Sequence, residues 1–112
     1  MKRLIAVLAA VAVAGAALMA IPAFGATKSV SLRDNVFSPR TITIKRGDSI
    51  RFVWRGKNPH NITTTSRPRG ARRITVGTRT RGSVRKRFTR RGTYRLLCVI
   101  HQPTMRMTVR VR

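Results

Sequence analysis

The stretch Gly92–Arg112, GTYRLLCVIHQPTMRMTVRVR, holds the chain's one cysteine, one of its two histidines and two of its four methionines. Apolar and polar residues alternate with a period of two on both sides of a short segment that contains Pro103. Because successive side chains of a β-strand point to opposite faces, this alternation predicts two strands joined by a turn. Cys98, His101 and Met105, spaced C-x2-H-x3-M, therefore lie together at one end of a predicted hairpin.

The second histidine, His60, lies well upstream, directly after Pro59. If His60 reaches the end of the hairpin, a thiolate, two imidazoles and a thioether come together there. This ligand set is typical of a blue-copper electron-transfer site, in which a constrained plane of three ligands and a weak axial methionine suit both oxidation states. Met107 has the same strand phase as Met105 and is the alternative axial ligand.

Each of these residues also has a purely structural interpretation. A lone cysteine is commonly a small buried hydrophobe, and methionines that alternate along a strand commonly pack in a core. His60, in a loop after Pro59, could be an exposed loop residue. The combination favours a metal site, because both histidines and the cysteine fall at predicted strand ends. The chain has only two carboxylate side chains, Asp34 and Asp48. Two carboxylates, two histidines and no glutamate are too few for most acid–base or two-metal sites. A multicopper oxidase needs several more histidines, and none remain once the blue site is filled, so the sequence predicts no enzyme.

The first 26 residues read as a targeting segment. A short basic start precedes the uncharged run LIAVLAAVAVAGAALMAI, and small residues follow, which predicts a signal peptide cleaved after Gly25 or Ala26. The alternative is an uncleaved anchor, since the run approaches the length that spans a bilayer. Either way, residues 27–112 are predicted to form one exported domain in the periplasm, at the cell surface or outside the cell. A single cysteine cannot form an internal disulfide there, whereas a bound metal would stabilise so small a domain.

The chain is strongly basic, with 25 lysines and arginines against 2 acidic residues and a net charge of +23. Such a charge attracts anionic partners, and salt weakens the attraction. We expect the partner to be an acidic redox protein or an anionic cell-surface component, with membrane association through an uncleaved leader or the basic surface as an alternative. The arginines could instead form only a solvated surface. Export and the scarcity of exposed aromatics argue against nucleic acid, and we expect a monomer.

Further short strands are predicted before the hairpin. Ser66–Gly82 is rich in arginine, glycine, proline and threonine and reads as a long loop or a weak edge strand around Ile74 and Val76. Seven or eight short strands separated by turns predict a β-sandwich or barrel whose edges are guarded by arginine and lysine. The predicted strands upstream of the hairpin, with a shorter piece at 36–37, are 28–33, 41–45, 49–54, 60–65 and 84–89.

Three segments of this domain resemble the cupredoxins, the family of plastocyanin, amicyanin and pseudoazurin. The segments are NVFSPRTITIKRGDSIRFVW (35–54), NPHNIT (58–63) and FTRRGTYRLLCVIHQPTM (88–105), and the resemblance covers nearly all of residues 27–112. It implies an all-β fold, a Greek-key β-sandwich of seven or eight strands with copper at one end.

By this resemblance, His60, Cys98, His101 and Met105 hold one copper ion that cycles between Cu(I) and Cu(II). Asn61 matches the asparagine that ties the two ligand loops together, and the carbonyl of Pro59 matches a backbone group close to the metal. Groups of this kind orient the ligands and tune the reduction potential. His101 corresponds to the histidine whose edge reaches solvent and passes the electron.

Three features depart from the family. The spacing between His101 and Met105 falls between the family's shorter and longer loops, no glycine follows Met105, and the acidic docking patches of plastocyanins are replaced by a basic surface. The function predicted is that of an exported type 1 (blue) copper protein that carries one electron. The alternatives are an extracytoplasmic copper scavenger or carrier, and a basic anion-binding module with a weak or lost metal site, whose signal is the Arg-rich loop 67–91.

Overall fold

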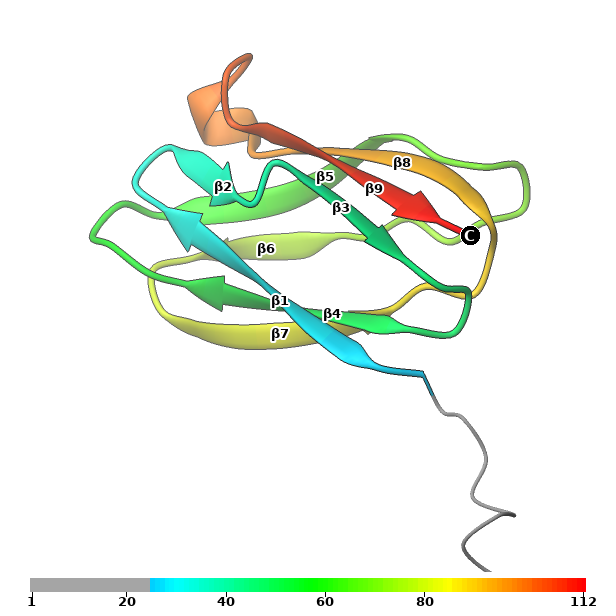
Figure 1. The fold of residues 1–112 in the computed structure, drawn as a ribbon. Helices are drawn as coiled ribbons and strands as arrows, with labels where there is room; N and C mark the ends of the chain where they lie inside the picture. The colour runs from blue at the N-terminus through cyan, green and yellow to red at the C-terminus, as the bar shows by residue number, and fades with distance from the viewer. Residues whose placement is uncertain (1–24) are drawn as a thin grey trace, which may run out of the picture.

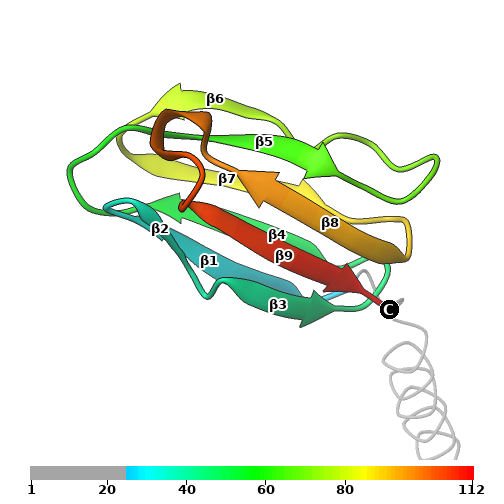
Figure 2. The ribbon, with the colours of Figure 1, turned by 90° about the horizontal axis from the view of Figure 1, so that it is seen from above.

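Two β-sheets packed face to face make up the part of the chain described by the computed structural model, residues 25–112 (Figure 1). The four-stranded sheet has the order β2-β1-β4-β7 and the five-stranded sheet the order β3-β9-β8-β5-β6. Seen from above, the larger sheet lies over the smaller one, and the strands of the two sheets run in broadly similar directions (Figure 2). The strands are β1 Thr27–Arg33, β2 Val36–Ser38, β3 Thr41–Ile44, β4 Ser49–Trp54, β5 His60–Ser66, β6 Val76–Arg79, β7 Gly82–Arg87, β8 Gly92–Leu97 and β9 Arg106–Val111.

The chain changes sheet repeatedly, after β2, β3, β4, β6 and β7. β1 pairs with β4, and β3 with β9, in parallel, whereas the other pairs are antiparallel. The predicted all-β sandwich is confirmed. The described residues form nine strands rather than seven or eight, because Val36–Ser38 pairs as a separate short edge strand. In the segment that sequence left open, 67–75 is a loop and Val76–Arg79 is an edge strand against β5.

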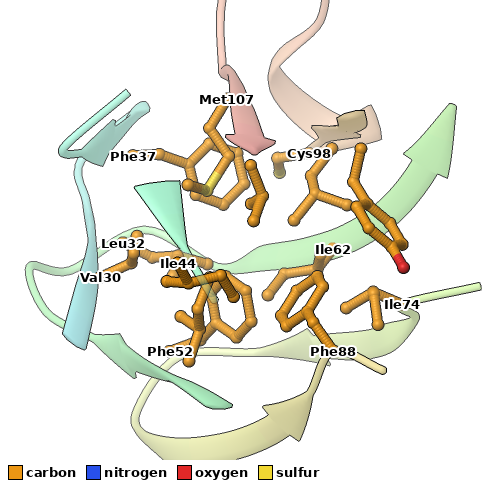
Figure 3. Packing of buried hydrophobic residues seen from close by; sticks show 14 of the residues in the cluster. Val30, Leu32, Phe37, Ile44, Phe52, Ile62, Ile74, Phe88, Cys98 and Met107 are labelled. Atoms are coloured by element: carbon orange, nitrogen blue, oxygen red, sulfur yellow. The ribbon is translucent and has the colours of Figure 1, made fainter. Parts of the chain in front are cut away.

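The alternation of apolar residues builds the core between the sheets (Figure 3). In β4, Ile50, Phe52 and Trp54 are buried while Arg51 points outward. Met107, Val109 and Val111 of β9 and Tyr94 and Leu96 of β8 cover them from the other sheet. Burying one such side chain contributes about 1.5–3 kcal/mol. Within residues 25–112, the members of this core lie between residues 30 and 111.

The sandwich has two ends that differ in what they carry. At one end β8 runs into a short 3-10 helix, η1 (Val99–His101), and β5 begins; we call this the η1 end. At the opposite, distal end, β1, β4 and β8 begin, and the C-terminus lies there as well (Figure 1). The predicted leader, residues 1–26, lies outside the described residues except for Gly25 and Ala26. No helix within residues 25–112 is both long and apolar enough to cross a membrane.

At the distal end, Asp48 forms hydrogen bonds with the residue that precedes β1. Its buried carboxylate accepts hydrogen bonds from the backbone N–H groups of Lys45 and Ala26, each at 2.9 Å. These bonds, that of Lys45 first, hold the pKa of Asp48 below its usual value. The N–H of Ser49 also donates to the carbonyl of Ala26 at 2.9 Å. The residue before β1 is therefore bonded to the turn that leads into β4.

Gly92, at the start of β8, provides a test of the distal packing. Its φ is 132°, a region that favours glycine, and a Cβ there would collide with the side chain of Pro68. We expect Gly92→Ala to lower the free energy of unfolding by about 1–3 kcal/mol, measured by chemical denaturation of the metal-free protein. The control is Gly77→Ala in β6, whose added Cβ meets no atom within 4 Å and which should change stability by less than about 0.5 kcal/mol. Equal effects would contradict this account.

Candidate metal centre

The pairing of β5 with β8 brings the two ligand segments together. The strands are antiparallel, with Thr63 opposite Leu97 and Thr64 opposite Leu96. Since β5 begins at His60 and β8 ends at Leu97, His60 lies beside the segment that follows β8. That segment contains Cys98 and His101 and returns as β9, so the predicted hairpin is present.

Three potential ligand atoms converge at this point. The Nδ1 atoms of His60 and His101 are 3.3 Å apart, and Sγ of Cys98 lies 4.0 Å from the first and 3.6 Å from the second. The circumradius of that triangle is about 2.1 Å. Bonds from zinc, a similar first-row ion, to histidine nitrogen and cysteine sulfur are about 2.0–2.1 and 2.3 Å. One metal ion therefore fits between the three side chains as they stand.

Burial favours the neutral, metal-binding form of the His60 imidazole. His60 and Cys98 are fully buried, whereas His101 is partly exposed. Burial, followed by the charge of His101, lowers the pKa of His60, so its imidazole is neutral at neutral pH, as metal binding requires. Nε2 of His60 is buried and has no hydrogen-bond partner of good geometry. Ligation through Nδ1 would leave the ring's proton on Nε2.

The segment Cys98–Met105 is a closed loop. The N–H of Cys98 donates to the carbonyl of Met105 at 2.9 Å, and the N–H of Met105 donates to the carbonyl of His101 at 3.1 Å. The N–H of His101 donates to the carbonyl of Cys98 at 3.2 Å. These bonds show how the C-x2-H-x3-M spacing is accommodated. Met105 and Met107 are both buried members of the hydrophobic core, in which Figure 3 labels Met107. The role of Met105 as the axial ligand, with Met107 as the alternative, stays a prediction.

Asn61 joins the two ligand segments. Its Oδ1 accepts a hydrogen bond from the N–H of Val99 at 3.0 Å, and its Nδ2 donates to Oγ1 of Thr78 at 3.4 Å. The residue next to His60 is thereby bonded to the residue next to Cys98. Pro59 is exposed and precedes His60, and the placement of its carbonyl near a metal stays a prediction.

Two further residues support His60 that the sequence did not single out. Nε1 of Trp54 donates to the carbonyl of His60 at 2.9 Å in the interior. Oδ1 of Asp34 accepts from the N–H groups of Lys57 and Asn58, at 2.8 and 3.0 Å, and so holds the loop that leads to His60. Trp54 was expected only in the core and Asp34 only in a turn, and nothing in their local sequence signals these long-range bonds.

Comparison with known proteins gives the site a context. Residues 26–112 match the family described as copper binding proteins, plastocyanin/azurin family. A pseudoazurin from Methylobacterium extorquens AM1 is 26% identical with a TM-score of 0.68, covering 76% of this chain and 74% of that one. No match was found among curated proteins.

Two further solved structures share the fold. A reduced variant of amicyanin is 24% identical with a TM-score of 0.67, covering 77% of this chain and 82% of that one. A copper-containing nitrite reductase from Thermus scotoductus SA-01 is 23% identical with a TM-score of 0.66, but only 22% of its chain is covered, against 77% of this one.

The bond between Asn61 and Val99 can be tested by substitution. We expect Asn61→Ala to weaken copper affinity by about 10–100-fold, because the two ligand loops lose their tie. Competition titration against a copper chelator measures the change. Asn61→Asp, which keeps the acceptor oxygen, should retain most of the affinity.

The matched control for this test is Thr65→Ala. It removes another side-chain-to-backbone hydrogen bond of β5, from Thr65 Oγ1 to the carbonyl of Arg95 at 3.2 Å, at a position away from the cluster. If both alanine variants lost affinity equally, Asn61 would have no special role at the metal.

Proposed function

Because the chain belongs to the plastocyanin/azurin family of copper-binding proteins, we propose that it carries one electron by means of a single copper ion held by His60, Cys98 and His101. Met105 is the proposed fourth, axial ligand. The observation that carries the proposal is the convergence of two imidazole nitrogens and one thiolate sulfur around a point about 2.1 Å from each. Thiolate and imidazole in a constrained plane are the ligands that blue-copper proteins use.

The protein's contribution to electron transfer is to hold the ligand side chains in nearly fixed positions when the copper is oxidised or reduced. Trp54, Asn61 and Asp34 fix the loops that carry the ligands, and the burial of His60 and Cys98 excludes water from them. A copper ion bound there supplies a couple between Cu(I) and Cu(II). Because side chains held by packing and hydrogen bonds cannot rearrange freely, these ligands would move little between Cu(I) and Cu(II), which would favour fast transfer.

His101 offers the shortest route to the surface. It is the only partly exposed member of the cluster, and its neighbours Val99 and Ile100 are 41% and 46% exposed. No charged residue occurs between Leu96 and Met105. We propose that a redox protein docks on this uncharged surface, and that acidic groups around its own docking face are attracted by the surrounding basic residues. Export of the chain rests on its leader and stays a prediction.

The residues outside the cluster favour electron transfer over catalysis as the function of the protein. Both histidines of the chain lie in the cluster, so none is left for a second copper centre of the kind an oxidase or reductase requires. The alternative role is a copper carrier, which would use the same ligands but exchange the ion readily. The test below distinguishes the two.

The visible spectrum of the protein after addition of one equivalent of Cu(II) tests the proposal. We expect an intense blue band from the thiolate–copper bond, bleached reversibly by a mild reductant. Cys98→Ser should abolish the band, and circular dichroism should show that the variant remains folded. A protein that binds Cu(I) but stays colourless would favour the carrier role. Copper binding without a reversible one-electron couple would refute electron transfer.

The two methionines can be separated by voltammetry. Replacing an axial thioether by an alkyl group removes a weak ligand of Cu(II), so we expect Met105→Leu to raise the reduction potential by on the order of 60 mV, which is tenfold in the equilibrium constant. The matched control is Met107→Leu, a volume-conserving change in the core that should leave the potential unchanged. If only Met107→Leu moved the potential, the axial assignment would pass to Met107.

A further inference from the structure

A cleft lined by basic side chains lies at the distal end, away from the metal centre. Its volume is about 500 Å³, and its cations are Arg72, Arg73, Arg85, Lys86 and Arg87. Buried Ile74, Phe88 and Tyr94 form its apolar floor. We call these five cations with their floor the cationic cleft. The metal centre does not use any of them.

No acidic side chain within residues 25–112 forms an ion pair with the cationic cleft. The chain has only two acidic side chains. Asp34 binds the N–H groups of Lys57 and Asn58 at the η1 end, and Asp48 binds those of Lys45 and Ala26. Five cations around one hollow repel one another, so an external anion would relieve their repulsion.

Parts of the cleft are already held in place. Nη1 of Arg73 donates to the carbonyl of Thr64 at 3.4 Å, and Nε of Arg87 donates to the carbonyl of Gly47 at 3.1 Å. The loop carrying Arg72 and Arg73 also packs against the next turn, where Gly70 lies against the guanidinium of Arg90. Guanidinium groups fixed in this way bind phosphate oxygens in a bidentate manner at a smaller cost in side-chain entropy.

The start of the chain indicates which phosphate-bearing partner fits. Gly25 and Thr27 line a second hollow with Arg85 and Arg87, so the domain begins beside the cationic cleft. The uncharged apolar run of the sequence, residues 4–26, leads directly into this end. The η1 end, by contrast, carries the uncharged stretch from Leu96 to Met105. The end that carries the cationic cleft is thus the end that a membrane-inserted or membrane-seeking leader would hold against a bilayer.

We propose that the cationic cleft docks the distal end onto a membrane surface rich in anionic phospholipid, with its guanidinium groups on the headgroup phosphates. Each lysine or arginine close to such a surface contributes to the binding free energy, and this electrostatic attraction weakens as the salt concentration rises. The η1 end, on the opposite side of the sandwich, then faces away from the lipid. The proposal rests on the charge and shape of the distal end and does not require the metal centre to carry electrons.

The test is co-sedimentation of residues 25–112, once circular dichroism has shown that they fold alone, with vesicles of phosphatidylcholine alone or with added phosphatidylglycerol. We expect binding only to the anionic vesicles. The triple variant Arg72→Gln, Arg85→Gln and Lys86→Gln should bind roughly tenfold more weakly or worse. The matched control, Arg33→Gln, Lys57→Gln and Arg81→Gln, removes two arginines and one lysine at the η1 end and should stay within about twofold of the unaltered protein.

Equal losses in the two triple variants would mean a diffuse charge effect and would overturn the proposal. So would failure of the unaltered protein to bind anionic vesicles, and binding of soluble polyphosphate in their place would identify a soluble phosphate polymer as the ligand. Hydrogen exchange on vesicles supplies an independent readout. Slower exchange in 67–73 and 86–92 with no change in 99–104 supports the orientation, and the reverse pattern refutes it.

Discussion

The antiparallel pairing of β5 with β8 is the constraint on which the metal centre depends. It sets His60, at the start of one strand, beside Cys98, just past the end of the other. A shift of this register by one residue would turn the side chains of β5 to the opposite face. The bonds from Trp54 to His60 and from Asn61 to Val99 both cross from the His60 segment to a neighbouring one, and they hold this register where the strands end. The fold and the site are therefore specified by the same pairing.

What could be predicted from sequence was chiefly what is local along the chain. Cys98, His101 and Met105 lie within one turn, so their spacing alone indicated a common location. The alternation in β4, β8 and β9 identified the buried faces because a strand's period of two is visible in the residues themselves. The fold class followed from the number and spacing of such strands. The proximity of His60 to Cys98 and His101 was different. Periodicity indicated only that His60 lies at a strand end, and the resemblance to cupredoxins placed it beside the other two ligands.

The features that escaped prediction join residues through space. No local pattern connects the indole of Trp54 with the carbonyl of His60, or Asp34 with the loop at Lys57 and Asn58. The same holds for the basic residues, which are spread along the sequence with little visible order. Only the folded chain shows that five of them surround one hollow at the distal end while the stretch around His101 stays free of charge. The sequence shows the excess of basic residues but not how they are distributed between the cationic cleft and the uncharged stretch around His101.

The bonds made by Ala26 bear on how a leader would be removed. Cleavage after Gly25 would make Ala26 the first residue, and its new ammonium group would lie 2.9 Å from the carboxylate of Asp48. The neutral hydrogen bond would become a charge-assisted ion pair, which is stronger. Cleavage after Ala26 would instead delete both its bond to Asp48 and its bond to Ser49. Two processing sites one peptide bond apart would thus yield mature proteins whose first strand is secured to different degrees.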